Sequence, residues 1–154
     1  MIGGITMKII KKVLILNLLV IISLVGAIGC NSIDKVENEF DLDVFKEEMK
    51  SRGYDFEIED IEPYFSSNES KTMKIGEALI GVYSYKNNKE MENNAKYISL
   101  DGSSFCNGKE SLEIDWISKP HFYKKESIIV NYVGEDEKIL DDLKDIFGTQ
   151  FTEI

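Results

Sequence analysis

The hydrophobic residues of this chain follow two different patterns. Residues 13–29 form an apolar run that only Asn17 and Ser23 interrupt. From residue 41 onward, hydrophobic residues alternate with polar ones or recur every three or four positions, as they do in a folded domain with one buried side. The pattern therefore predicts a hydrophobic leader followed by one small globular domain.

The first elements of that domain are predicted between residues 41 and 59. Asp41 is a typical N-cap, and Gly53 can adopt the left-handed conformation that ends a helix. Between them, apolar residues recur at helical spacing: Leu42, Phe45 and Met49. Residues 54–59 then alternate hydrophobic with acidic side chains, which predicts a half-buried strand with an acidic outer face. The polar run 66–70 predicts a loop.

A hairpin followed by a helix is predicted next. The turn Gly76-Glu77 joins a strand that ends at residue 75 to the hydrophobic run 78–85, and glycine at the first turn position favours a tight connection. Asn87, with Glu90 three residues later, matches a capping box. One face of the following helix carries Met91, Ala95 and Ile98.

Turn dipeptides divide the middle of the chain. Asp101-Gly102 and Asn107-Gly108 bracket Cys106, the lone cysteine of the domain, which we expect to be a buried packing residue. Beyond them, three hydrophobic residues alternate with acidic ones and predict another strand: Leu112, Ile114 and Trp116. Lys119-Pro120 ends it.

The order hairpin, then helix, is predicted again near the C-terminus. Strands at 121–125 and 128–133 precede a helix that Asp136 caps and Gly148 ends. That helix carries the apolar residues Ile139, Leu140, Leu143, Ile146 and Phe147.

These elements predict an α+β fold, with an antiparallel sheet and about three helices packed mainly on one face. An offset of 49 residues aligns 77–83 with 126–132 and Asn87 with Asp136. The identity is sparse, so either a duplication or two similar hairpin–helix units would account for the similarity. The chain is thus predicted to divide into a signal peptide at 1–29, a tether at 30–40 and a single domain at 41–154.

The end of the apolar run has the chemistry of a lipoprotein processing site. The small residues Ala27 and Gly29 precede Cys30, and three lysines form a basic flank on the N-terminal side of the run: Lys8, Lys11 and Lys12. The 17 residues from 13 to 29 are at the short limit for a membrane helix. An uncleaved N-terminal membrane helix is the alternative.

Residues 7–30 resemble the type II signal peptides of bacterial lipoproteins, although Ala27 stands where leucine is commoner. The resemblance implies diacylglycerol on the Cys30 sulfur, cleavage after Gly29 and a cell-membrane anchor that faces outward. At about 0.8 kcal/mol per buried methylene, two acyl chains would anchor the protein stably. Residues 118–134 and the acidic helix after them are also similar to small uncharacterised lipoproteins of Gram-positive bacteria, and this resemblance implies no activity or ligand.

The charge of the chain narrows its partners. The sequence contains 18 basic and 28 acidic residues, a net charge of −10. Removal of the leader with its three lysines leaves 15 bases against 28 acids, near −13. Long-range repulsion therefore disfavours nucleic acids and anionic lipid headgroups as partners.

One cluster resembles a binding site. Trp116, His121 and Tyr123 lie within eight residues and include the only tryptophan and the only histidine. They would form a small ligand-binding surface if their rings converged. In the alternative interpretation, Trp116 and Phe122 are core residues, and His121 and Tyr123 lie on the solvent side of a strand.

Catalytic and metal motifs are not found. No nucleophile-elbow sequence accompanies Ser103 or Ser104, and Asp41, Asp43 and Glu47 do not complete a calcium loop. We therefore expect no cofactor and no metal.

The leading hypothesis is a lipid-anchored extracytoplasmic accessory or binding domain, which acts on the outer face of the cell membrane through Cys30. The alternatives are a small cell-envelope enzyme or hydrolase accessory that uses His121 and Tyr123, and a structural or immunity-type lipoprotein.

Overall fold

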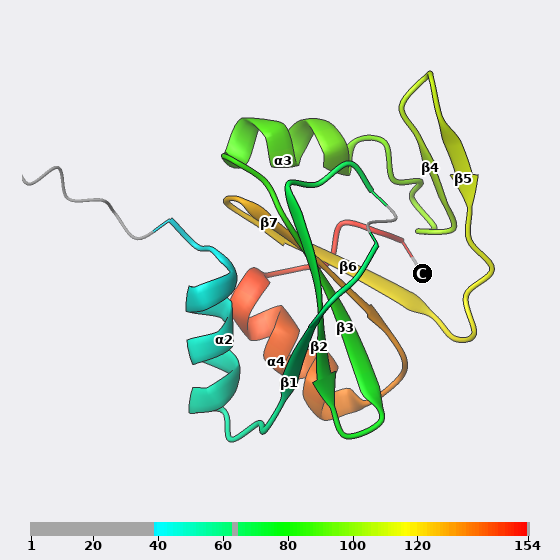
Figure 1. Ribbon diagram of the computed structural model, residues 1–154. Coiled ribbons are helices and arrows are strands. Elements are labelled where there is room, and N and C mark those ends of the chain that lie inside the picture. Colours follow the sequence, from blue (N-terminus) through cyan, green and yellow to red (C-terminus); the bar gives the residue numbers. More distant parts are fainter. Residues whose placement is uncertain (1–38, 63–64, 154) are drawn as a thin grey trace, which may run out of the picture. The chain divides into compact units, whose positions relative to one another are not determined.

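A five-stranded antiparallel sheet organises the fold (Figure 1). The computed structural model describes residues 39–62 and 65–153, so the predicted signal peptide, Cys30 and most of the tether lie outside the described residues. The strand order is β1-β2-β3-β7-β6. In that order the strands are β1 (Glu57–Asp60), β2 (Glu69–Ile75), β3 (Ala78–Ser84), β7 (Ile128–Val133) and β6 (Pro120–Lys125).

Both predicted hairpins are confirmed, and they join at the middle of the sheet. β2–β3 and β6–β7 are each antiparallel hairpins, and β3 pairs with β7. Ile80 and Ile129, which the 49-residue offset aligns, belong to the two different hydrophobic clusters on opposite faces of the sheet. The two hairpin–helix units therefore have the same order of elements, but residues that the offset aligns point to opposite faces of the sheet.

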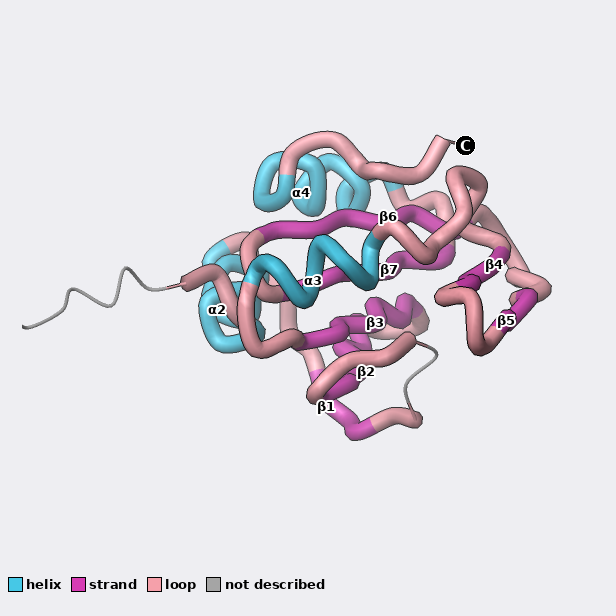
Figure 2. Tube along the Cα trace, turned by 90° about the horizontal axis from the view of Figure 1, so that it is seen from above, coloured by secondary structure: helices cyan, strands magenta, loops and turns pink. Residues whose placement is uncertain are grey.

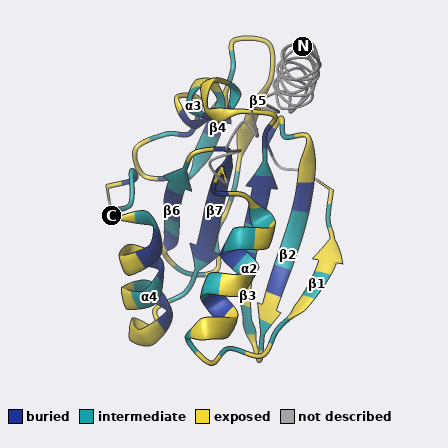
Figure 3. Ribbon diagram, turned by 90° about the vertical axis from the view of Figure 1, so that its left-hand side faces the viewer, coloured by how far each residue is buried: buried dark blue, intermediate teal, exposed yellow. Residues whose placement is uncertain are grey.

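Within the described residues, three helices cover the sheet, in agreement with the predicted α+β class. Figure 3 shows α2 (Leu42–Ser51) and α4 (Glu137–Phe147) in front of the strands. Both pack on a cluster that includes Phe45, Met73 and Leu143. The third helix, α3 (Asn88–Ala95), packs on the opposite face. That face carries a second cluster, with Phe65, Tyr83, Phe122 and Ile129 among its members.

The three predicted helix caps are confirmed. Each depends only on residues that are close in the chain. The Asp41 carboxylate accepts hydrogen bonds from the backbone N–H groups of Asp43 and Val44, at 2.9 and 3.0 Å. The Asn87 side chain accepts from the Glu90 N–H at 3.0 Å, and Asp136 caps α4 in the same way. Each of these bonds satisfies an N–H group that has no partner within its helix.

Strand boundaries differ from the predictions where pairing decides them. The strand predicted at 54–59 is β1 at 57–60, because its register with β2 begins at Glu57. β2 begins at Glu69, inside the predicted loop. The strand predicted through Trp116 ends at Glu113. The segments left outside the ladders still pack on the core, through the half-buried side chains of Tyr54, Phe56, Ile114 and Trp116.

Phe40, the last residue of the predicted tether, belongs to the folded domain. Its ring is buried and lies edge-on to Phe147, with centroids 5.3 Å apart. Its N–H donates to the Glu126 carboxylate, and its carbonyl accepts from Ser127 Oγ at 3.3 Å. The start of the domain is therefore fixed to the β6–β7 turn.

The C-terminal residues cover the outer edge of β6. The Phe151 N–H donates to the Phe122 carbonyl at 3.0 Å, and the Phe122 N–H donates to Thr152 Oγ1 at 3.4 Å. The Glu153 N–H donates to the Leu100 carbonyl at 2.6 Å. This edge is therefore closed to strand addition by the chain itself.

Within the described ranges, no helix is both long and apolar enough to cross a membrane.

Candidate functional site

The three residues predicted to form a binding surface lie on two faces of the sheet. Trp116 packs beside Phe122 on the α3 side, with ring centroids 6.2 Å apart, and its Nε1 donates to the Gly102 carbonyl at 2.8 Å. His121 stacks on Tyr132 on the opposite side, at 6.2 Å. Tyr123 lies among the core residues beneath α4. Their rings do not converge on one surface.

The surroundings of His121 and Tyr123 do not resemble a catalytic pair. His121 Nδ1 is 2.8 Å from Gln150 Oε1, and its Nε2 is buried. The expectation that Tyr123 faces solvent is wrong: only 4% of it is exposed, because α4 covers this side of β6. Burial, and then the negative charge of Asp141, raise the pKa of the Tyr123 hydroxyl. A phenol in this environment is poorly suited to proton transfer near neutral pH.

A projecting segment offers a different candidate site. Residues 97–117, here called the β4–β5 lobe, contain a two-stranded sheet of β4 (Ser104–Cys106) and β5 (Ser111–Glu113). Figure 2 shows this pair standing apart from the main sheet, at the end away from α2. Phe122 lies against the Trp116 ring and the Gly102 backbone, and these contacts fasten the lobe to β6.

The lobe carries most of the large hydrophobic side chains that are exposed in the described residues. Five large hydrophobic side chains are exposed in the part of the chain that the structure describes, and four of them lie in the lobe. They are Tyr97 (40% exposed), Leu100 (65%), Leu112 (36%) and Ile117 (99%). Exposed apolar side chains gathered on a surface excursion are typical of protein interaction sites.

The lobe also contains an open hollow of about 400 Å³ with polar walls. Its lining consists of Ser103, Ser104, Glu113, Ile114 and Asp115. Two carboxylates and two hydroxyls are suited to cationic or hydrogen-bonding groups of a partner. The hollow therefore places polar groups beside the exposed apolar side chains of the lobe.

Cys106, on β4, is exposed, contrary to the expectation that it packs in the core. Side chains alternate along a strand, and its neighbour Phe105 takes the inward position with 3% exposure. The burial of Phe105 therefore directs the thiol outward.

A network around Asp101 stabilises the turn at the base of the lobe. Its carboxylate accepts hydrogen bonds from Ser99 Oγ at 2.6 Å, from Ser103 N–H at 3.0 Å and from Ser103 Oγ at 2.8 Å. These bonds, with Ser99 the largest contributor, lower the pKa of Asp101 to about 2.

This network predicts a pH dependence that is confined to acid. Because the folded-state pKa lies below the ordinary value of 3.8, the stabilisation is complete above that value and is lost as the pH falls through about 2. NMR titration of the Asp101 carboxyl carbon should report this depressed pKa. The double variant Ser99→Ala, Ser103→Ala should return it toward 3.8; an unchanged low pKa would contradict the assigned cause.

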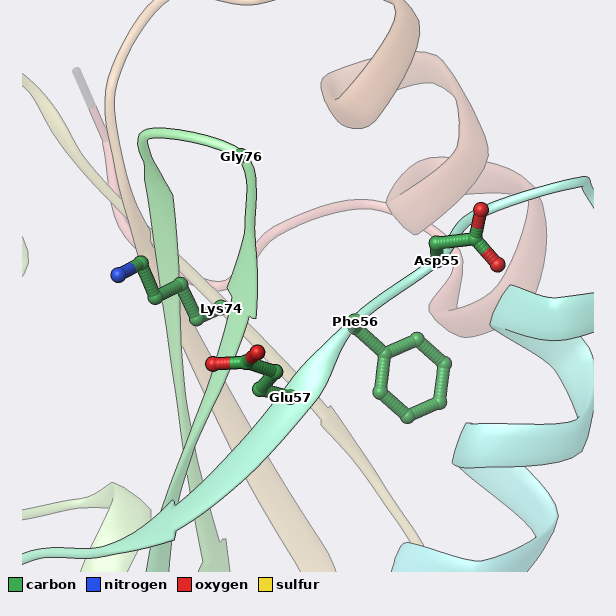
Figure 4. Close-up of a pocket in the computed structure, with 5 residues that line it drawn as sticks. All are labelled: Asp55, Phe56, Glu57, Lys74 and Gly76. Carbon is green, nitrogen blue, oxygen red and sulfur yellow. The ribbon is translucent and has the colours of Figure 1, made fainter.

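A second hollow, of about 420 Å³, lies beside the β1–β2 pair (Figure 4). Glu57 and Lys74 are register partners and point to the same side of these strands, whereas Phe56 turns toward α2. The side chains do not converge, so this hollow lacks the focused polar groups of a ligand site. Within residues 39–62 and 65–153, no cluster of histidine, cysteine, aspartate or glutamate could hold a metal ion.

The sequence contains a signal for the lobe, which is the close spacing of two turn dipeptides. Two turn dipeptides six residues apart, Asp101-Gly102 and Asn107-Gly108, leave room for only very short strands between and after them. Short strands bury few side chains, so Tyr97, Leu100, Leu112 and Ile117 remain exposed.

Comparisons of the chain with protein-family models, curated proteins and solved structures gave no match.

Proposed function

We propose that this chain is a lipid-anchored extracytoplasmic accessory or binding domain, and that it contacts a protein partner through the β4–β5 lobe. The observation that supports this most is the gathering of exposed Tyr97, Leu100, Leu112 and Ile117 on one projecting segment. Leaving large apolar side chains in water is unfavourable, and burial of apolar surface against a partner is the main driving force of protein association.

The anchor rests on the sequence alone, through the lipobox-like segment that ends at Cys30. The first fixed point of the domain is Phe40. Nine residues lie between the two, and the ten steps of the chain from Cys30 to Phe40 reach at most about 36 Å when fully extended. An anchored domain would thus meet partners that lie close to the outer membrane surface, such as other membrane proteins or nearby envelope components.

Lipid attachment makes a direct prediction about the two cysteines. Metabolic labelling with an alkyne-bearing palmitate should mark the wild-type protein and the Cys106→Ala variant, and should be abolished in Cys30→Ala. The reason is that the thioether to diacylglycerol requires the Cys30 sulfur, whereas Cys106 is a surface thiol within the domain. Label on Cys30→Ala, read by gel fluorescence, would remove the anchor from the proposal.

The contact surface is tested by site-specific photo-cross-linking in intact cells. A photoreactive residue at Leu112, in the lobe, should capture a protein partner. The matched position Leu79 is also an exposed leucine on a strand but lies outside the lobe, and it should capture far less. Capture that is equal at both positions, or capture of lipid only, would count against a protein-binding lobe.

A further inference from the structure

Within residues 39–62 and 65–153, no strand pairs with the outer edge of β5. Antiparallel partners alternate between pairs that exchange hydrogen bonds and pairs that do not. The Ile114 N–H donates to the Ser103 carbonyl at 2.8 Å, and the Asn107 N–H donates to the Glu110 carbonyl at 3.2 Å. This alternation directs the backbone groups of Leu112 toward β4 and those of its two neighbours, Ser111 and Glu113, away from β4.

The other edge of the same ribbon is already occupied. The Cys106 N–H donates to the Tyr97 carbonyl at 2.9 Å, and the Ser99 N–H donates to the Ser104 carbonyl at 2.8 Å. β4 therefore has neighbours on both sides. All three residues of β5 are exposed, so within the described chain its outward groups face solvent. An unpaired strand edge is a template for an added strand.

The two faces of the ribbon differ in chemistry. On one face, Phe105 is the register partner of Leu112, and the Tyr97 ring lies edge-on to Phe105 with centroids 5.7 Å apart. On the other face, Ser104 is the register partner of Glu113, whose side chain lines the hollow together with Asp115. A strand laid along β5 would thus meet an apolar row on one side and carboxylates on the other.

We propose that β5 accepts, as an added strand, an extended segment of a partner protein in which basic and apolar residues alternate. The alternation matches the period of a strand, so its basic side chains would lie beside Glu113 and Asp115 while its apolar ones cover Leu112. The acidic charge of the whole chain favours the approach of such a segment. This inference rests on the proposed role of the lobe as a protein-binding surface.

β5 fits such a partner better than the other sheet edges. The outer edge of β6 is bonded to the C-terminal residues. β1 is also an edge strand, but its one apolar residue, Ile58, packs toward the α2 side of the core, and Asp60 is ion-paired with Lys71. Among the edge strands of the described residues, β5 alone combines an open edge with an exposed apolar side chain, Leu112, and with two carboxylates that line one hollow.

The test uses the acylated protein in phosphatidylcholine nanodiscs and a fluorescent, acetylated eight-residue peptide of alternating lysine and valine. Fluorescence anisotropy should detect binding of this peptide, and no binding of the matching glutamate–valine peptide. Glu113→Pro removes the outward N–H and the negative charge. It should weaken binding of the peptide about tenfold or more, because an edge hydrogen bond and the attraction between Glu113 and the lysines are both lost. Glu113→Gln removes only the charge and should weaken it about two- to fivefold.

A second measurement guards against local unfolding of the proline variant. Unchanged Trp116 fluorescence would show that the lobe still packs on Phe122 in Glu113→Pro. Independently, a lysine–valine peptide with N-methyl groups at alternate residues cannot donate along one edge, and it should bind the wild type about tenfold more weakly. Equal affinity for the methylated and unmethylated peptides would overturn strand addition.

Photo-cross-linking at Leu112 in the Glu113 variants distinguishes failure of strand addition from failure of the proposed function. If Leu112 still captures its partner in cells when Glu113 is replaced by proline, the lobe is a contact surface but strand addition is wrong. If the wild-type Leu112 position captures no protein, the proposed function itself fails. Loss of capture in Glu113→Pro, with capture kept in Glu113→Gln, supports both.

Discussion

Replacement of Phe122 by alanine is expected to lower the free energy of unfolding by about 3–5 kcal/mol, the range for removal of a fully buried aromatic ring. Phe122 has no exposed surface, and its ring centroid lies 5.7 to 6.2 Å from those of Phe65, Phe151 and Trp116. These neighbours come from a loop, the C-terminal segment and the base of the lobe. The cavity would therefore loosen several parts of the fold at once.

Urea denaturation followed by far-UV circular dichroism measures this change. Ile117→Ala is the matched control, because Ile117 is 99% exposed and its truncation should change the free energy of unfolding by less than about 0.5 kcal/mol. A Phe122→Ala loss below about 1.5 kcal/mol would mean that the neighbouring rings collapse into the space, and that the ring does not hold the lobe in place.

Gly102→Ala is expected to destabilise the domain by about 2–4 kcal/mol, from two causes that add. Gly102 has a φ of +68°, in the left-handed region that side chains disfavour. An added Cβ would also lie 2.9 Å from Phe122 Cε2 and 3.2 Å from Pro120 Cγ. Both neighbours are buried side chains, so neither can move aside without disturbing the contact between the lobe and the sheet.

Gly108→Ala separates these causes, because Gly108 has a φ of +83° but open space around the added Cβ. It should cost only about 1 kcal/mol, from the backbone conformation. Combining Gly102→Ala with Phe122→Ala should lower the cost of the added methyl, since its closest contact, with the Phe122 ring, is removed and only the contact with Pro120 Cγ remains. Full additivity in the same urea titrations would contradict the contact between Gly102 and Phe122.

Local features could be predicted because the residues that decide them are neighbours in the chain. The caps at Asp41, Asn87 and Asp136 each use a side chain and an N–H two or three residues away. The turns of the two main hairpins depend in the same way on adjacent residues. No distant contact is needed to form any of these features.

The candidate site could not be predicted in the same way. Trp116, His121 and Tyr123 are close in sequence, but Trp116 lies in the segment between β5 and β6, which packs on the α3 side, whereas His121 and Tyr123 lie on β6 and face the α4 side. Proximity along the chain therefore did not produce a shared surface. The β4–β5 lobe was not predicted as a site, although Leu112 and Ile117 are exposed on it. Their exposure depends on which parts of the surface the helices leave uncovered.

By itself, the sequence determined the α+β class, the two main hairpins and the helix caps, since each depends on short-range pattern or on residue type. The tertiary structure alone decided that α2 and α4 share one face and α3 takes the other, and that Tyr123 is buried and Cys106 exposed. It also decided that β5 keeps an edge that no strand of the described residues covers. The physical reason is that burial and edge pairing are set by long-range packing, in which every element competes to cover the same sheet.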